Sequence, residues 1–123
     1  MVMHDVIDAK EINVNDLRIN GELILQGSEE IAAGGGSTEL DMTKAVHIIS
    51  ADAGGDVFTI SDGVVGQQMT IIGLAMAGTA TITPDTMFAG TSVTFNAAGD
   101  SVVLMFIETD GWTVIGGNSY AII

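Results

Sequence analysis

The chain of 123 residues contains no cysteine and only three basic residues. Without cysteine it can form neither a disulfide framework nor a thiolate metal site, so packing, backbone hydrogen bonds and association must stabilise it. Sixteen acidic residues against the three basic ones give a formal net charge of -13. Because such an excess repels phosphate backbones, we expect no nucleic-acid partner.

A stretch without charge, residues 63–84, raises the question of a membrane span. Gln67, Gln68, Pro84, several threonines and several glycines interrupt this stretch, and its local pattern is that of strands. We therefore predict no membrane partner. The N-terminal sequence MVMHDVIDAKEINVND carries charges throughout and lacks the apolar run of a secretory signal.

The mean hydropathy is positive, +0.47, in spite of the large net charge. This combination predicts that the carboxylates lie on a thin outer shell while a large apolar surface is buried, part of it between chains. The length is that of one domain with its own core.

The composition changes near the run Gly34-Gly35-Gly36. Nine of the nineteen charged side chains precede the end of this run, and the residues after it are rich in Val, Ile, Thr and Gly. Since three glycines offer no side chain to pack, we place a boundary there. We predict an extended N-terminal arm over residues 1–36 and a compact body over residues 37–123.

The arm contains an Asn-Gly dipeptide, Asn20-Gly21, between two runs in which apolar residues alternate with polar ones. Such a dipeptide favours a β-hairpin. The alternating apolar residues are candidate interface residues; they are Leu17, Ile19, Leu23 and Leu25. A short helix beginning at Asp5 is an alternative for the first dozen residues.

The body is typical of a series of short strands separated by turn signals. The predicted strands lie near residues 44–50, 56–61, 68–74, 79–83, 91–96, 101–107 and 112–116. Short strands at this spacing predict an all-β fold, a jelly-roll-like β-sandwich. Val93 and Phe95 alternate with polar neighbours as in a half-buried strand, whereas the run from Val102 to Ile107 indicates burial on both faces.

The C-terminal segment predicts a hairpin closed by a two-residue turn at Asp110-Gly111. Trp112 begins the second strand of this hairpin. We interpret Trp112 as a core residue or an inter-subunit anchor rather than as a stacking platform for a ligand, because it falls in a strand directly after a turn.

Few residues suggest chemistry. His47 lies in a strand pattern without a nearby acidic partner or a second histidine, and His4 lies near the N-terminus. The segment Asp52–Asp56 has two carboxylates but not the dense acidic spacing of a calcium loop, and is better explained as a Gly-rich turn. Glu108 and Asp110 flank a turn. We predict no catalytic residue, no metal site and no cofactor.

Four segments carry a family resemblance: INVNDLRINGELIL, TATITP, GTSVTFNAAGDSVVLMF and DGWTVIGGN. Together they resemble the small β-sandwich modules of tailed-phage virion proteins, found in capsid decoration proteins and in trimeric fibre or spike domains. The resemblance implies a non-enzymatic homotrimer on the capsid surface of the virion. It further implies that an extended N-terminal arm reaches over subunits of the major capsid protein.

Two other classes of protein remain as alternatives. One is a trimeric tail fibre or spike tip, an adhesin that binds a host-surface glycan. The other is an enzyme or small-molecule-binding jelly roll of the cupin kind, which needs a cluster of His and carboxylates on inward-facing strand positions. The two well-separated histidines do not favour the cupin alternative.

Overall fold

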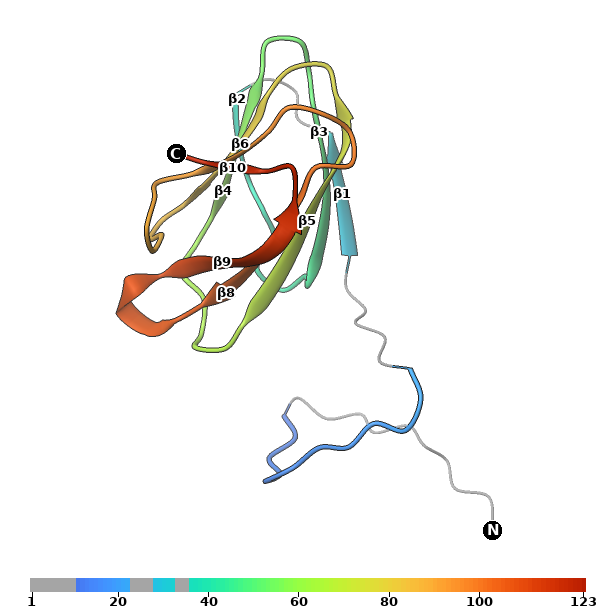
Figure 1. Cartoon of the computed structure of the whole chain (residues 1–123), viewed down its shortest axis with the longest axis vertical. Helices are drawn as coiled ribbons and strands as arrows, with labels where there is room; N and C mark the ends of the chain where they lie inside the picture. Colours follow the sequence, from blue (N-terminus) through green and yellow to red (C-terminus); the bar gives the residue numbers. More distant parts are fainter. Residues whose placement is uncertain (1–10, 23–27, 33–35) are drawn as a thin grey trace.

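The computed structural model describes residues 11–22, 28–32 and 36–123. Within them the chain forms two five-stranded sheets packed face to face, with the N-terminal segment extending away from the body (Figure 1). The first sheet has the order β1 (Ser28–Ala32), β3 (Val46–Ala51), β5 (Gln68–Met76), β8 (Ser101–Phe106) and β9 (Trp112–Asn118). The second sheet has the order β10 (Ala121–Ile122), β7 (Val93–Phe95), β6 (Ala80–Pro84), β4 (Asp56–Ile60) and β2 (Gly36–Glu39). The prediction of an all-β sandwich is confirmed.

The first six strands alternate between the two sheets. In the first sheet β3 pairs in parallel with both β1 and β5, and in the second sheet β4 pairs in parallel with both β2 and β6. The chain therefore winds through three stacked coils, each with one strand in either sheet. This connectivity differs from the predicted jelly roll, whose strands pair antiparallel in Greek keys.

Antiparallel pairing begins only after the third coil. Strand β7 pairs with β6, β8 with β5, and β9 with β8. These strands cover the edges that the last coil would otherwise leave unpaired, and so they close the stack at its C-terminal side. At the other side β1 and β2 are the edge strands.

Alternating side chains of both sheets fill the space between them. Buried and half-buried positions alternate along β3, β6 and β8, as expected for strands with one face on a core. The largest buried side chains include Trp112, Phe58 and Phe95. The ring of Trp112 meets Phe106 edge to face, with centroids 5.4 Å apart, an arrangement that aromatic pairs favour.

The seven predicted strands each overlap an observed one, and three strands were not predicted: β1, β2 and β10. Strand β1 falls within the range predicted as the arm, yet it is paired in register with β3 along its whole length. The sandwich therefore includes residues that precede the glycine run.

The predicted hairpin of the arm lies partly outside the described residues. Residues 11–22, which include Leu17 and Ile19, contain no strand. Leu23 and Leu25 lie outside the described residues, as does nearly all of the segment in which a short helix was the alternative. The hairpin stays a prediction.

The C-terminal turn is longer than predicted. Strands β8 and β9 are joined by residues 107–111, which include a 3-10 turn, η1 (Glu108–Asp110), instead of a two-residue turn. Gly111 has a φ of 90°, and a side chain there would collide with the backbone of Thr86. A glycine is needed at this point because the chain passes so close to its neighbour.

Two predictions of burial were wrong. Strand β8 alternates between buried and half-buried positions instead of being buried on both faces. Strand β7, expected to be half-buried, is buried at all three positions, because Thr94 is covered as well as Val93 and Phe95. Strand β10 lies beside β7, and Thr94 Oγ1 donates a hydrogen bond to the carbonyl of Ala121, with 3.5 Å between the oxygens.

Candidate interface surfaces

Trp112 holds together the loops at one end of the body. Its indole Nε1 donates a hydrogen bond to Ser61 O at 2.9 Å, and its backbone N donates to Thr86 O at 3.0 Å. Its carbonyl accepts a hydrogen bond from Phe88 N at 2.9 Å. The side chain is 0% exposed. Of the two interpretations of Trp112, the structure places it in the core, where it offers no surface to a partner.

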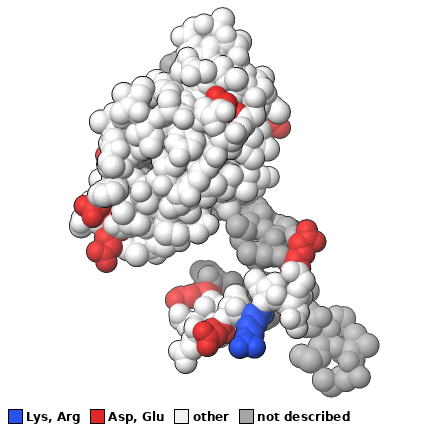
Figure 2. Space-filling model, viewed as in Figure 1, with Lys and Arg blue, Asp and Glu red and all other residues white. Residues whose placement is uncertain are grey.

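Carboxylates surround this end of the body. Five acidic side chains of the four loops that meet here are exposed: Asp41, Asp62, Asp85, Glu108 and Asp110. Lys44 is the basic residue of these loops. In Figure 2 the body is mostly white with red side chains at its margins, while the arm carries both red and blue. Most described charged side chains of the body lie in its loops, while Glu30, Glu39 and Asp56 lie in strands.

Asp41 stabilises a tight local turn. Its Oδ1 accepts hydrogen bonds from Thr43 N at 2.8 Å and from Thr43 Oγ1 at 2.6 Å. The hydrogen bond from the Thr43 side chain has the larger effect and that from the Thr43 backbone the smaller. Both hold the pKa of Asp41 below its ordinary value of 3.8.

At the opposite end, two buried carboxylates organise turns. Asp56 Oδ2 accepts a hydrogen bond from Asp52 N at 2.8 Å, and Asp100 Oδ2 accepts from Asn96 N at 2.8 Å and Ala97 N at 3.0 Å. The segment Asp52–Asp56 is thus a turn, as predicted, and the carboxylates of Asp52 and Asp56 close it. Among the described residues no three or more His, Asp or Glu lie close enough together to hold a metal ion.

His47 is 0% exposed on the inward side of β3, and its Nε2 lies 3.1 Å from the carbonyl oxygen of Lys44. It is therefore a core histidine of the strand. In the part of the chain that the structure describes, no helix is long and apolar enough to cross a membrane.

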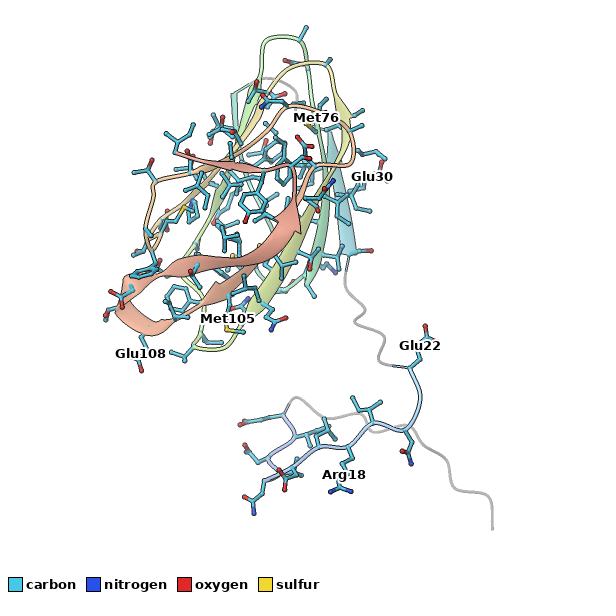
Figure 3. The ribbon with its side chains drawn as sticks, in the orientation of Figure 1. Arg18, Glu22, Glu30, Met76, Met105 and Glu108 are labelled. Carbon is cyan, nitrogen blue, oxygen red and sulfur yellow. The ribbon has the colours of Figure 1, made fainter. Side chains whose placement is uncertain are left out.

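The arm presents apolar side chains to solvent. All residues from 11 to 22 are exposed, and four of them are large and apolar: Ile12, Val14, Leu17 and Ile19, with exposed fractions of 52%, 56%, 67% and 47%. Arg18 lies among them, as Figure 3 shows. Of the predicted interface residues, Leu17 and Ile19 are therefore accessible to a partner.

Sequence reasoning missed a second apolar surface, the outward side of the first sheet. We call it the first outer face; its apolar side chains are Val46, Ile48, Ile72, Leu74, Val103, Met105 and Ile115. Ile72, Leu74 and Ile115 are 36%, 51% and 49% exposed. Register joins these residues across the sheet, since Ile48 pairs with Ile72.

The outward side of the second sheet, which we call the second outer face, has a different chemistry. Its outward positions carry Ser37, Glu39, Val57, Thr59, Thr81, Thr83 and Thr94. Register places Thr81 beside both Val57 and Thr94, and Thr83 beside Thr59. Most outward positions of this face therefore carry hydroxyl groups. The first outer face is mixed, because polar side chains lie among its alkyl groups: Ser50, Gln68, Thr70, Ser101 and Thr113.

Comparison of the chain with protein-family models and with curated proteins finds no match.

Proposed function

We propose that this protein is a non-enzymatic structural protein of a phage virion, a trimeric capsid decoration (cement) protein located on the capsid surface. In this proposal the N-terminal arm binds the major capsid protein, and the sandwich stays outside the shell as a rigid body.

The exposed arm is the observation that carries the proposal. Leu17 and Ile19 belong to a segment in which every residue from 11 to 22 is exposed and no strand is formed. Large apolar side chains gathered on such a segment favour an interaction with a partner, since soluble proteins rarely expose contiguous apolar surface without one. A segment that becomes ordered on binding can also cover a large area of its partner.

The charge of the arm indicates what kind of surface it fits. Arg18 lies between Asp16 and Glu22, so this part of the arm presents both signs of charge beside its apolar residues. A shell surface with mixed charge and apolar grooves is complementary to it. The body, whose exposed loops are mainly acidic, is repelled by a negative surface and is therefore held outward.

The mechanism of stabilisation in this proposal is mass action. A protein that binds the assembled shell but not its separated subunits lowers the free energy of the assembled state. Contacts made by the arm with neighbouring subunits must break before the shell opens. The temperature at which the genome is released therefore rises when the protein is bound.

The test is a heat-release assay on particles with and without the protein. Wild-type chain should raise the release temperature, and the double variant Leu17→Asp/Ile19→Asp should lose most of the increase. The control Asn13→Asp/Asn15→Asp adds the same two charges to the arm and keeps the apolar side chains, so it should keep most of the increase. Equal release temperatures with and without wild-type protein would contradict a cement role.

The alternative, a tail fibre or spike tip that binds a host-surface glycan, is favoured by one observation. Phe88 is 48% exposed at the acidic end of the body, where its backbone N is held by Trp112 O. An exposed aromatic ring can stack on a sugar. Glycan-array binding that is lost in Phe88→Ala, together with unchanged release temperatures, would support this alternative.

A further inference from the structure

The first outer face lacks charge as well as a covering. Strands β3, β5, β8 and β9 contain no Asp, Glu, Lys or Arg, and Glu30 on the edge strand β1 is the outward carboxylate that borders the face. Figure 3 labels Met105 on β8, within this face, and Glu30 on the edge strand β1.

The central strand of this sheet, β5, has apolar residues on both sides, although Gln68 and Thr70 also lie on its outer side. In β5, Met69 and Ile71 are buried in the core, while Ile72 and Leu74 lie on the outer side and are 36% and 51% exposed. Sheets with parallel strands normally have both faces covered, and their strands are apolar on both sides for that reason. Among the residues that the structure describes, the parallel set β1, β3 and β5 is covered on only one face.

We propose that the first outer face is the surface through which copies of this chain associate. The inference rests on the self-association contained in the proposed function, but not on binding to a capsid. It assigns the contact to residues on β3, β5, β8 and β9, none of which belongs to the arm.

Electrostatics favour a second copy as the occupant. Every copy carries a charge of -13, with exposed carboxylates in the arm and in the loops such as Asp62 and Asp85. Contact through those regions would place like charges opposite each other at a Coulombic cost. Contact through the first outer face brings no carboxylate of β3, β5, β8 or β9 near another.

The size of the face is also sufficient. With the edge strand β1 included, five strands about 4.8 Å apart and about six residues long, at about 3.3 Å per residue, give a flat area of roughly 500 Å². Two such faces in contact bury about 1,000 Å² in total, which is where specific interfaces begin.

The second outer face supplies the matched control. Thr81 is half-buried at the centre of that face, as Ile72 is central to the first. Both Ile72→Lys and Thr81→Lys place one ammonium group on an outward strand position. An unpaired charge among apolar side chains must lose its hydration when copies associate, whereas a charge on a solvated face does not.

Sedimentation equilibrium of the full-length chain at micromolar concentration tests the inference, with far-UV circular dichroism to check that each variant folds. Wild-type protein should be oligomeric, Ile72→Lys should weaken association by on the order of 100-fold or more, and Thr81→Lys should change it less than about threefold. A dimer that Ile72→Lys dissociates supports this interface and contradicts only the trimeric part of the proposed function. A monomeric wild type, or an oligomer that Ile72→Lys leaves intact, overturns the interface, while the heat-release assay decides separately on the arm.

A second measurement, the labelling of single thiols, does not require a charged side chain to be introduced into the sheet. Since the chain has no cysteine, Leu74→Cys and Thr81→Cys each provide a single thiol for a maleimide. The Leu74→Cys thiol should be protected at high protein concentration and become reactive on dilution, while the Thr81→Cys thiol should react equally at both concentrations. Protection of Leu74→Cys that persists in the diluted monomer would mean that the chain covers its own face, and this would overturn the proposal.

Discussion

The two outer faces of the sandwich are built on the same inward alternation and yet differ in chemistry. On the inner side, Ile71 of β5 and Ile82 of β6 are both 0% exposed. On the outer side, Thr70 and Ile72 flank Ile71 in β5, while Thr81 and Thr83 flank Ile82 in β6. Threonine keeps the β-branch that strands favour and adds a hydroxyl group for water. The inward residues of a strand thus indicate which core it packs against. Its outward residues indicate whether the other side of the sheet faces water or a partner.

The largest loss of stability is expected from a change of Trp112, which is buried in the core between the two sheets. Trp112→Ala should lower the free energy of unfolding by about 3–5 kcal/mol, because it removes a fully buried indole from the core. Chemical denaturation measures the loss, and Trp112→Phe, which keeps a ring but lacks the Nε1 donor to Ser61 O, should lose less. Because Trp112 is the single tryptophan, native fluorescence should be blue-shifted. Water-like emission would contradict its burial.

A smaller effect should separate the two faces. Ile72→Thr should lower the melting temperature of the assembled protein, by an amount that corresponds to about 1 kcal/mol, because less apolar surface is buried between copies. Thr81→Ile should change stability by no more than about 0.5 kcal/mol. Calorimetry at several protein concentrations gives the comparison, since only association makes the melting temperature depend on concentration. Equal shifts in both variants would remove the distinction between the faces.

The dependence of association on salt also separates the uncharged first outer face from the charged remainder of the chain. Raising the ionic strength from about 0.01 M to about 0.1 M shortens the Debye length from about 30 Å to about 10 Å. Copies of charge -13 then repel one another less, while an uncharged contact face is unaffected. Association measured by light scattering should therefore become tighter by several-fold. Association that becomes weaker with salt would instead indicate ion pairs between copies.

The smallest effect concerns a loop outside both faces. The pKa of Asp41 is lower in the folded chain than its ordinary value of 3.8, so its charged form stabilises the fold. This contribution is complete above the ordinary pKa and is lost as the pH falls through the lowered one. Asp41→Asn should therefore reduce the melting temperature slightly at pH 7 and by less at pH 2. A reduction of the same size at both pH values would contradict the role of the charge.

The strands of the body could be predicted from sequence because their period of two is local. The strand expected at residues 44–50 is β3, and that expected at residues 68–74 is β5. Their parallel pairing could not be predicted, because alternation gives a strand but not its partner. The coils also differ in length: Glu29 pairs with His47, 18 positions later, and His47 pairs with Ile71, 24 positions later. An internal repeat of irregular length leaves no regular signal in the sequence.

The surfaces were predicted in part. Leu17 and Ile19, predicted from their apolar alternation as interface residues of a hairpin, are exposed, but residues 11–22 form no strand. Their interface role stays a prediction. Trp112 was correctly placed in a strand after a turn, but its burial depends on contacts with Ser61 and Thr86, which are distant in sequence. The first outer face was missed because β5 reads as one apolar run, in which inward and outward residues look alike until the register is known.

The most direct test of the account is a cryo-electron map of particles that carry this protein. The account predicts density at the three-fold positions of the capsid, with three sandwiches whose first outer faces turn toward the axis and whose arms lie over the shell. Single copies at separate positions would contradict the interface through the first outer face. Density on the tail with none on the capsid would contradict the proposed function.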